Sequence, residues 1–293
     1  MHRLRHILSS SKISTERADL LSYGFDASKI KSQPAAVCWP EDTEDVIALS
    51  KFAYEEDIPL VPRGAGTSTT GSAVPTRGGI VVSLERMNQI IEIDTDNLFV
   101  MVEPGLINGH LQRELSLRGY FYPPDPSSLE FCTIGGNVAV NAGGPRAVKY
   151  GVTSNYVRYL EAVLMDGRLI KVGARTKKSV VGYDLKSLLI GSEGTLATIT
   201  KIGLGILPEP ESILTLIASF DSLRGATETV TAIIRNRIIP RALEFIDRTT
   251  LWALKQYQAT GFMDGEALLI IELDGQRKAV EEDADRVVKL CQQ

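Results

Sequence analysis

A glycine-rich run at the end of an apolar segment constrains the fold of this chain more than any other feature. The segment IPLVPRG, residues 58–64, predicts a short buried strand, and the run VPRGAGTSTTGSAVP, Val61 to Pro75, follows from it. Gly64, Gly66 and Gly71 let the backbone come close to another group. The amides and hydroxyls of the run favour a phosphate as that group.

The residues after this run exclude the dinucleotide-binding fingerprint of the Rossmann fold. That fingerprint needs GxGxxG at the start of a helix. Here Pro75, Gly78 and Gly79 prevent a helix, and the next regular element, IVVSL at 80–84, predicts a strand. The run therefore joins strand to strand, and we expect loop amides rather than a helix terminus to hold a phosphate.

Size and composition restrict the class of protein. A chain of 293 residues with 44% hydrophobic residues is long enough for two globular domains. The chain has 32 basic and 36 acidic residues, which gives a formal charge of −4. Because a nucleic-acid-binding protein usually has a basic surplus, nucleic acid is not expected as the main partner. No apolar run approaches about 18 residues, so no membrane-spanning segment is expected.

Cysteine and histidine are too few and too scattered to predict a metal site or a disulfide framework. The cysteines are Cys38, Cys132 and Cys291, and none belongs to a CxxC pair. The histidines are His2, His6 and His110. We interpret His110 as a partly exposed residue on a helix over 106–118 whose buried stripe is Ile107, Leu111 and Leu115. We therefore expect no metal on this chain and a reducing compartment.

Several further elements follow from periodicity and turn residues. The start, MHRLRHILSSSK, is read either as a short surface helix or as a transit peptide. A helix is predicted over 40–57 and two hairpins at 90–104 and 157–172. After Pro208-Glu209-Pro210, strands at 213–220, 241–247 and 266–275 alternate with helices. This last part predicts a separate α+β unit whose sheet has one unfinished edge.

A long, charge-poor segment lies between these elements, from Tyr120 to Val157. It contains four prolines, five glycines and three asparagines, and we interpret it as a loop. Because a loop of that length with so little charge is not a solvated linker, we expect it to pack against a large, flat, partly apolar group. The alternative is that Gly135 and Gly136 begin a helix.

Five motifs occur in a fixed order along the chain. They are PRGAGTS (62–68), PDPSS (124–128), TIGGNVAVNAGG (133–144), YGVT (150–153) and GSEGTLA (191–197). In this order they resemble the FAD-binding domain of the vanillyl-alcohol oxidase (PCMH-type) superfamily. The subgroup that the chain resembles most holds the FAD-linked subunit of glycolate oxidase and the D-lactate and D-2-hydroxyglutarate dehydrogenases. The segment STERADLLSYGFDAS, 14–28, is similar to that subgroup as well.

The resemblance implies an α+β fold with a definite domain order. A PCMH-type FAD-binding domain of two α/β subdomains is expected over 33–211, after an N-terminal helical segment at 1–32. A partial α+β, ferredoxin-like cap domain is expected over 212–293. In the subgroup, later residues of the cap hold a divalent metal and the substrate carboxylate, and we expect those residues beyond Gln293.

The resemblance also implies one FAD site built from these motifs. The diphosphate is expected at Pro62, Arg63, Gly64, Ala65, Gly66, Thr67 and Ser68. The isoalloxazine ring is expected beside Ser127, Ser128, Cys132 and Thr133, above Gly135 and Gly136. Its pyrimidine edge is expected along Asn141, Ala142, Gly143 and Gly144, with Tyr150 and Gly151 continuing the cradle. The ribose and adenine are expected beside Glu193, Gly194, Thr195 and Ile199.

Three of these assignments have a structural alternative. The side chain of Arg63 either faces the diphosphate or points away from it. Glu193 either belongs to the site or is a surface charge. Cys132 is read as a small packed side chain without chemistry of its own. Because Thr67 and Ser68 stand where some members of the superfamily carry a flavin-linked histidine, the FAD is expected to be noncovalent.

The activity implied is the oxidation of a small 2-hydroxy acid, such as glycolate or D-lactate, by hydride transfer to flavin N5. Electrons would pass on to a quinone, an electron-transferring flavoprotein or an iron–sulfur subunit, and a partner subunit could complete the site. We expect a cytoplasmic protein, peripheral to the inner membrane through its partners. No catalytic residue is assigned. The alternatives are a flavin-binding subunit that is inactive alone because its cap is incomplete, and a flavoenzyme like alkyl-glycerone-phosphate synthase, which SLEFCTIGG (128–136) also resembles.

Overall fold

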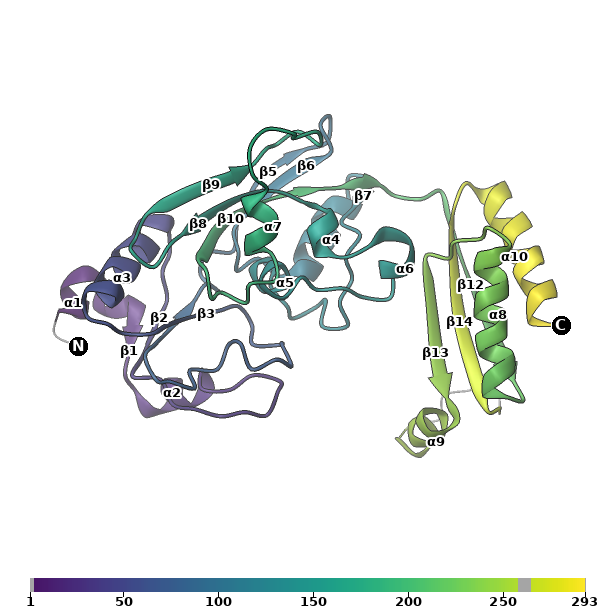
Figure 1. The fold of residues 1–293 in the computed structure, drawn as a ribbon, viewed down its shortest axis with the longest axis horizontal. Helices are drawn as coiled ribbons and strands as arrows, with labels where there is room; N and C mark the ends of the chain where they lie inside the picture. Colours follow the sequence, from purple (N-terminus) through teal and green to yellow (C-terminus); the bar gives the residue numbers. More distant parts are fainter. Residues whose placement is uncertain (1–2, 258–264, 293) are drawn as a thin grey trace. The chain divides into compact units, whose positions relative to one another are not determined.

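The computed structural model describes residues 3–257 and 265–292, and the chain divides into two compact units (Figure 1). The first unit comprises residues up to 122 together with 126–142 and 152–207. The second comprises 208 onward together with two short segments from earlier in the sequence, 123–125 and 143–151. These two segments are therefore distant in sequence from the unit with which they pack.

A small, mostly parallel sheet forms the first half of the first unit. Its order is β1 (Ile13–Ser14), β2 (Ala36–Cys38), β4 (Ile80–Ser83), β3 (Leu60–Arg63). Strands β2, β4 and β3 are parallel, and β1 is antiparallel to β2. Because β3 pairs directly with β4, the glycine-rich run does join strand to strand, as predicted.

Helix α3 (Thr43–Glu55) covers this sheet, and it begins within the segment predicted as a helix. Asp42 caps it by accepting a hydrogen bond from the amide of Asp45 at 2.9 Å. The chain begins with the short helices α1 (Leu4–Ile7), η1 (Ser10–Lys12) and α2 (Arg17–Ser22). Leu4 and Leu8 are buried in the core that also contains residues of α3, so the first described residues form a short packed helix.

A five-stranded antiparallel sheet forms the second half of the first unit. Its order is β5 (Ile90–Asp94), β6 (Phe99–Val102), β10 (Thr198–Gly205), β8 (Val157–Val163), β9 (Leu169–Gly173). Pairing of β5 with β6 and of β8 with β9 confirms both predicted hairpins. Helix α4 (Asn108–Ser116) also agrees with the prediction, and its Leu111 and Leu115 are fully buried in the core of this sheet. The remaining short elements are β7 (Tyr120–Phe121), α7 (Leu185–Leu189) and β11 (Leu207–Pro208).

The interpretation of 120–157 as a continuous loop was wrong. The segment contains helix α5 (Ile134–Val140), helix α6 (Ala147–Tyr150) and the 3₁₀ turn η2 (Thr153–Asn155). Helix α5 forms because the Thr133 side chain caps it and because Ile134 and Val138 are buried in the core of the five-stranded sheet. The alternative weighed above, that Gly135 and Gly136 begin a helix, is the one the structure adopts.

The second unit contains the alternating strands and helices predicted after the proline pair. They are β12 (Ser212–Phe220), α8 (Leu223–Arg235), β13 (Ala242–Asp247), α9 (Arg248–Tyr257), β14 (Ala267–Gly275) and α10 (Arg277–Cys291). The sheet is antiparallel in the order β12-β14-β13, and α8 and α10 lie together on one side of it (Figure 1). Ala226 and Ile233 of α8 and Val287 of α10 close its core.

None of the helices between residue 3 and residue 292, outside 258–264, combines the length and the apolar character that crossing a bilayer requires.

Candidate cofactor-binding site

The loop after β3 presents a row of backbone amides. Within the described chain, the N–H groups of residues 64–68 have no hydrogen-bond acceptor, whereas the amides of Thr70 and Ser72 are bonded to neighbouring hydroxyls. Gly66 has φ +69, in the left-handed region that glycine adopts without strain. Successive unpaired amides on a turn of this kind form a concave anion-binding site. The loop therefore fits the diphosphate of a dinucleotide.

The glycine loop meets the N-terminus of α5 at Gly64 and Thr133. A Cβ atom on Gly64 would lie 2.2 Å from the Thr133 hydroxyl oxygen, so only glycine permits this approach. The same hydroxyl accepts a hydrogen bond from the amide of Gly136 at 3.1 Å. Residues predicted for the diphosphate and for the flavin ring thus lie in direct contact, although about 70 residues separate them in the sequence.

A third motif joins the same place through Glu193 and Gly194. The Thr70 hydroxyl donates a hydrogen bond to Oε2 of Glu193 at 3.1 Å, and the Glu193 amide donates to the carbonyl of Ala139 at 2.8 Å. A Cβ on Gly194 would lie 3.2 Å from the ring of Pro62. Glu193 is therefore bonded to two of the other motifs and is not an isolated surface charge. Thr70 is a residue of this contact that the sequence analysis did not single out.

Arg63 is turned beneath the glycine loop. Its Nη1 donates to the carbonyl of Phe25 at 2.7 Å, and its guanidinium carbon lies 5.5 Å from the centre of the Tyr23 ring. Its Nη2 would be 2.2 Å from a Cβ on Gly66. Burial lowers the pKa of Arg63, but a guanidinium remains charged in proteins. The buried side chain thus places a positive charge beneath the row of amides, close to Gly66.

The predicted wall of the flavin ring is formed by α5 and the turn before it. Ser127 is exposed and Ser128 is partly buried, whereas Cys132 is only 3% exposed, and burial raises the pKa of its thiol. The amide of Gly135 donates to the carbonyl of Pro104 at 2.7 Å, and a Cβ there would lie 2.6 Å from the Pro104 ring. Gly135 therefore allows α5 to pack on Pro104, and Cys132 is a packed side chain.

The residues after α5 are held by the turn at 152–155. Asn141 ends the helix with φ +50, and its Oδ1 accepts a hydrogen bond from the amide of Ser154 at 2.9 Å. The carbonyl of Ala142 accepts from both the amide and the hydroxyl of Thr153, at 3.0 and 2.8 Å. Three further predicted residues, Gly143, Tyr150 and Gly151, belong to the second unit.

Two predicted residues near the end of the first unit have their side chains engaged inside the protein. The Thr195 hydroxyl donates to the carbonyl of Ser192 at 2.6 Å. Ile199 lies on β10, is 7% exposed and belongs to the core of the five-stranded sheet. Any cofactor contact at these two positions would therefore come mainly from the backbone.

A cavity of about 560 Å³ opens beside the contact between the glycine loop and α5. Ala65 of the loop and Thr133 line it, together with residues of α4 and of the segment before β5. The α4 residues are the exposed His110 and the partly buried Glu114. The cavity thus includes two predicted site residues and the one histidine that lies near the motifs in sequence.

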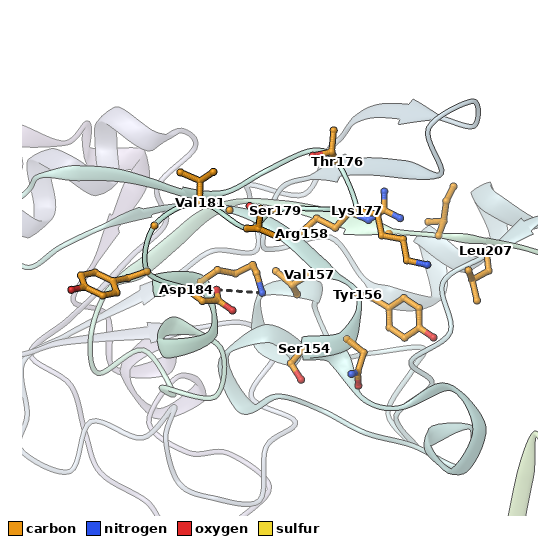
Figure 2. Close-up of a pocket in the computed structure, with 18 residues that line it drawn as sticks. Ser154, Tyr156, Val157, Arg158, Thr176, Lys177, Ser179, Val181, Asp184 and Leu207 are labelled. Carbon is orange, nitrogen blue, oxygen red and sulfur yellow. Dashed lines mark ion pairs between the residues drawn. The ribbon is translucent and has the colours of Figure 1, made fainter.

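Figure 2 shows another pocket of the first unit, of about 670 Å³, that contains no predicted site residue. Its lining comes from 154–158, from 173–186 and from 205–207, and it carries the cationic side chains of Arg158, Lys177 and Lys186. Asp184 pairs with Lys186 at 3.7 Å. Because three separate stretches without a recognisable motif form this pocket, the sequence analysis could not find it.

No group of three or more His, Cys, Asp or Glu side chains that could hold a metal ion occurs among residues 3–257 and 265–292. The cysteines at 38, 132 and 291 are all reduced. Burial raises the pKa of Cys38 to about 12, so its thiol stays protonated at neutral pH.

Comparison with protein families identifies both parts of the chain. The family described as the FAD binding domain matches residues 34–173, and the family described as FAD linked oxidases, C-terminal domain, matches residues 209–293. The first match contains four of the five motifs assigned to FAD binding, and the second covers nearly the same residues as the expected cap domain. FAD is therefore the cofactor of this fold.

Curated relatives cover nearly the whole chain. Glycolate oxidase subunit GlcD of Bacillus subtilis is 42% identical over 276 residues, which are 94% of this chain and 59% of the relative. D-lactate dehydrogenase of Archaeoglobus fulgidus is 39% identical over 89% of this chain and 60% of the relative. The chain thus spans about three-fifths of the length of these two relatives.

Solved structures share the fold at low sequence identity. Alkyldihydroxyacetonephosphate synthase superposes with a TM-score of 0.86 at 20% identity, over 99% of this chain and 59% of that one. p-Cresol methylhydroxylase superposes with a TM-score of 0.83 at 20% identity, over 99% of this chain and 62% of that one. The chain therefore consists of an FAD binding domain followed by the C-terminal domain of FAD linked oxidases, in the PCMH-type fold, and it is similar to glycolate oxidase subunits and D-lactate dehydrogenases.

Proposed function

We propose that this chain is the FAD-binding part of an enzyme that oxidises a small 2-hydroxy acid, of the glycolate or D-lactate class, to the 2-oxo acid. The names of the relatives supply the substrate class. The observation that carries the proposal is the convergence of three glycine-containing motifs on one place, through the contact of Gly64 with Thr133 and the hydrogen bond of Thr70 with Glu193.

The residues of this chain bind and orient the cofactor. When bound, FAD would supply a two-electron acceptor for the hydride of the substrate's 2-carbon, and a base would be needed for the hydroxyl proton. The unpaired amides of 64–68 hold the diphosphate, and the charge of Arg63 beneath them offsets its negative charge. Thr67 and Ser68 offer no histidine for a covalent bond, so the FAD is held noncovalently.

A spectroscopic experiment tests the substrate class. The FAD-loaded chain is mixed anaerobically with glycolate, D-lactate and D-2-hydroxyglutarate in turn, and the flavin band near about 450 nm is followed. We expect at least one of the three to bleach the band. Acid precipitation of the protein should release all of the FAD into the supernatant, because no covalent bond retains it.

The negative outcome separates the other candidates. If none of the three hydroxy acids bleaches the bound flavin of the chain alone, but one of them does once a partner subunit is added, the chain would be a flavin-binding subunit that is inactive alone. Flavin that stays oxidised in both cases would contradict the proposal and favour the chemistry of alkyldihydroxyacetonephosphate synthase, whose fold the chain shares.

Partners follow from the same proposal. Two relatives are named as subunits of glycolate oxidase, and we propose that this chain likewise works beside another subunit. That subunit, or a quinone or an electron-transferring flavoprotein, would take the electrons from the reduced cofactor. The protein would act in the cytoplasm, at the inner membrane through these partners.

Replacement of Arg63 tests the charge beneath the loop. In Arg63→Met the positive charge beneath the loop is lost, and we expect the Kd for FAD to rise about tenfold, since the attraction between a partly buried charge and a nearby diphosphate is worth about 1–2 kcal/mol. Arg77→Met removes an exposed arginine of the same loop and serves as the control. Titration of each variant with FAD measures the Kd, and equal values for Arg63→Met and Arg77→Met would contradict the role of Arg63.

A further inference from the structure

The pocket of Figure 2 has a surplus of positive charge. Its charged lining residues are three cations and one carboxylate, Arg158, Lys177, Lys186 and Asp184. The carboxylate is engaged as the cap of α7, where it accepts hydrogen bonds from the amide and the hydroxyl of Ser187 at 3.2 and 2.6 Å. Lys186 lies 3.7 Å from it. The lining thus carries two more positive than negative charges.

Arg158 has a defined place in the wall of this pocket. It lies on β8, where its carbonyl accepts a hydrogen bond from the amide of Ala174 at 3.0 Å. Its Nη1 donates to the carbonyl of Asn97, in the turn between β5 and β6, at 3.2 Å. A Cβ on Gly205 of β10 would lie 2.8 Å from its Nε, so glycine at that position leaves room for the guanidinium. Further donors of the guanidinium remain for a ligand.

Arg158 has no counterion of its own. No ion pair joins it to an acidic side chain in the described part of the chain, and burial lowers its pKa without a carboxylate to offset the effect. Arg146 differs, because burial lowers its pKa too but its Nε lies 3.2 Å from Oδ2 of Asp125. Lys177 is exposed and likewise forms no ion pair with a described residue. A partly buried cation without a counterion favours an anion from solution.

The size and chemistry of the pocket indicate which anion fits. Its volume of about 670 Å³ is within the range of small-molecule sites, about 300–1,000 Å³. Phosphate oxygens match a guanidinium and lysine ammonium groups, and a phosphate monoester carries a charge of about −1.5 to −2 at neutral pH. That charge balances the surplus. The hydroxyls of Ser154, Thr176 and Ser179 add neutral donors, and Tyr156 and Val157 add apolar surface.

We propose that this pocket binds a phosphate monoester whose organic group is small and apolar or aromatic. The phosphate is bound by Arg158, Lys177 and Lys186, and the organic group packs on Tyr156 and Val157. The site is independent of the proposed function, because none of the residues predicted to contact FAD lines the pocket. The first unit would then have a second small-molecule ligand besides its cofactor.

Titration calorimetry with phenyl phosphate tests the site on the FAD-saturated chain, in which the cofactor occupies the glycine loop. Succinate, a dianion without phosphate, and phenol, the ring without the charge, are the control ligands. Arg158→Met removes the guanidinium, and Lys177→Met removes an exposed cation of the pocket. Arg168→Met is the matched control variant, because Arg168 is exposed, lies outside the pocket and pairs with Asp166 at 2.6 Å.

We expect phenyl phosphate to bind the unmodified chain with a Kd below about 1 mM and at least about tenfold more tightly than succinate, and phenol not to bind. Arg158→Met should raise the Kd at least about tenfold, since a hydrogen bond to a charged group is worth about that factor. Lys177→Met should raise it about threefold, because an exposed charge contributes less. Arg168→Met should leave the Kd unchanged.

The inference would be overturned by any of three results. They are no binding of phenyl phosphate at millimolar concentration, equal affinity for phenyl phosphate and succinate, and equal Kd values for Arg158→Met and Arg168→Met. If Arg158→Met does not fold, Lys177→Met decides, because replacement of an exposed lysine leaves the core intact. If the chain binds no FAD, the proposed function fails, and the same variants still decide the pocket, since neither Arg158 nor Lys177 belongs to the glycine loop.

Discussion

Substitution of Gly64 by alanine should abolish FAD binding at concentrations that saturate the unmodified chain. The new Cβ would lie 2.2 Å from the Thr133 hydroxyl oxygen, well inside contact distance. Either the glycine loop must move, which distorts the row of amides, or the hydroxyl must rotate and give up its bond to the amide of Gly136. We expect the Kd for FAD to rise at least about a hundredfold, which corresponds to about 2.7 kcal/mol.

A second substitution shows whether this clash is the cause. Thr133→Ala removes the oxygen that the new Cβ would meet, at a cost of about 1 kcal/mol in stability for the lost helix cap. In the double variant Gly64→Ala/Thr133→Ala, most of the lost affinity for FAD should be restored. Fluorescence titration with FAD measures the Kd of each variant. Thr76→Ala, an exposed change in the same loop, is the control. If the effects of the two substitutions on the free energy of FAD binding were strictly additive, the contact between the glycine loop and α5 would not determine the conformation of the site.

Much of the fold was predictable because local signals mark its elements. The hairpins at β5–β6 and β8–β9 follow from alternating apolar residues around short turns, and the second unit follows from its alternating strand and helix patterns. Pro75, Gly78 and Gly79 correctly excluded a helix after the glycine loop, which separated this fold from the Rossmann fold. These are short-range effects of backbone sterics, and they do not depend on what packs against the segment.

Helix α5 shows where local signals fail. Its seven residues include two glycines, each costing about 1 kcal/mol in a helix relative to alanine, so propensity opposes it. The helix exists because Thr133 caps it and because Ile134 and Val138 reach the core of a sheet formed by distant strands. Of these two causes, the sequence indicates only the N-cap residue Thr133. A threonine three residues before a glycine is too common a pattern to predict a helix.

The candidate site depended on contacts between distant residues. Motif order indicated which residues belong together, but not how their side chains lie. The orientation of Arg63 depends on Phe25, 38 residues earlier, and the burial of Asp274 depends on Lys149, 125 residues earlier. Hydrogen bonds and ion pairs over such separations leave no periodic pattern in the sequence, so these two arrangements became apparent only from the structure.

Paired substitutions at Gly135 and Gly136 test the packing beneath the predicted flavin wall. In Gly135→Ala the Cβ would lie 2.6 Å from the Pro104 ring and 2.8 Å from its carbonyl oxygen, neither of which can move without shifting α5. Overpacking of this kind costs about 1–3 kcal/mol, and we expect a loss of about 2–3 kcal/mol in the free energy of unfolding. In Gly136→Ala the nearest atom is the Thr133 hydroxyl at 3.1 Å, a small adjustment that the helix propensity of alanine, about 1 kcal/mol, offsets.

Urea unfolding of the two variants should therefore differ strongly, although the substitutions are chemically identical and adjacent. Trp39 is a suitable probe, because it is 9% exposed within the first unit, whereas Trp252 of the second unit is 64% exposed and should respond little. We expect Gly136→Ala to unfold close to the unmodified chain and Gly135→Ala to be less stable by about 2–3 kcal/mol. Equal stabilities would mean that α5 can move away from Pro104 at no cost, and the wall beneath the flavin would then not be rigid.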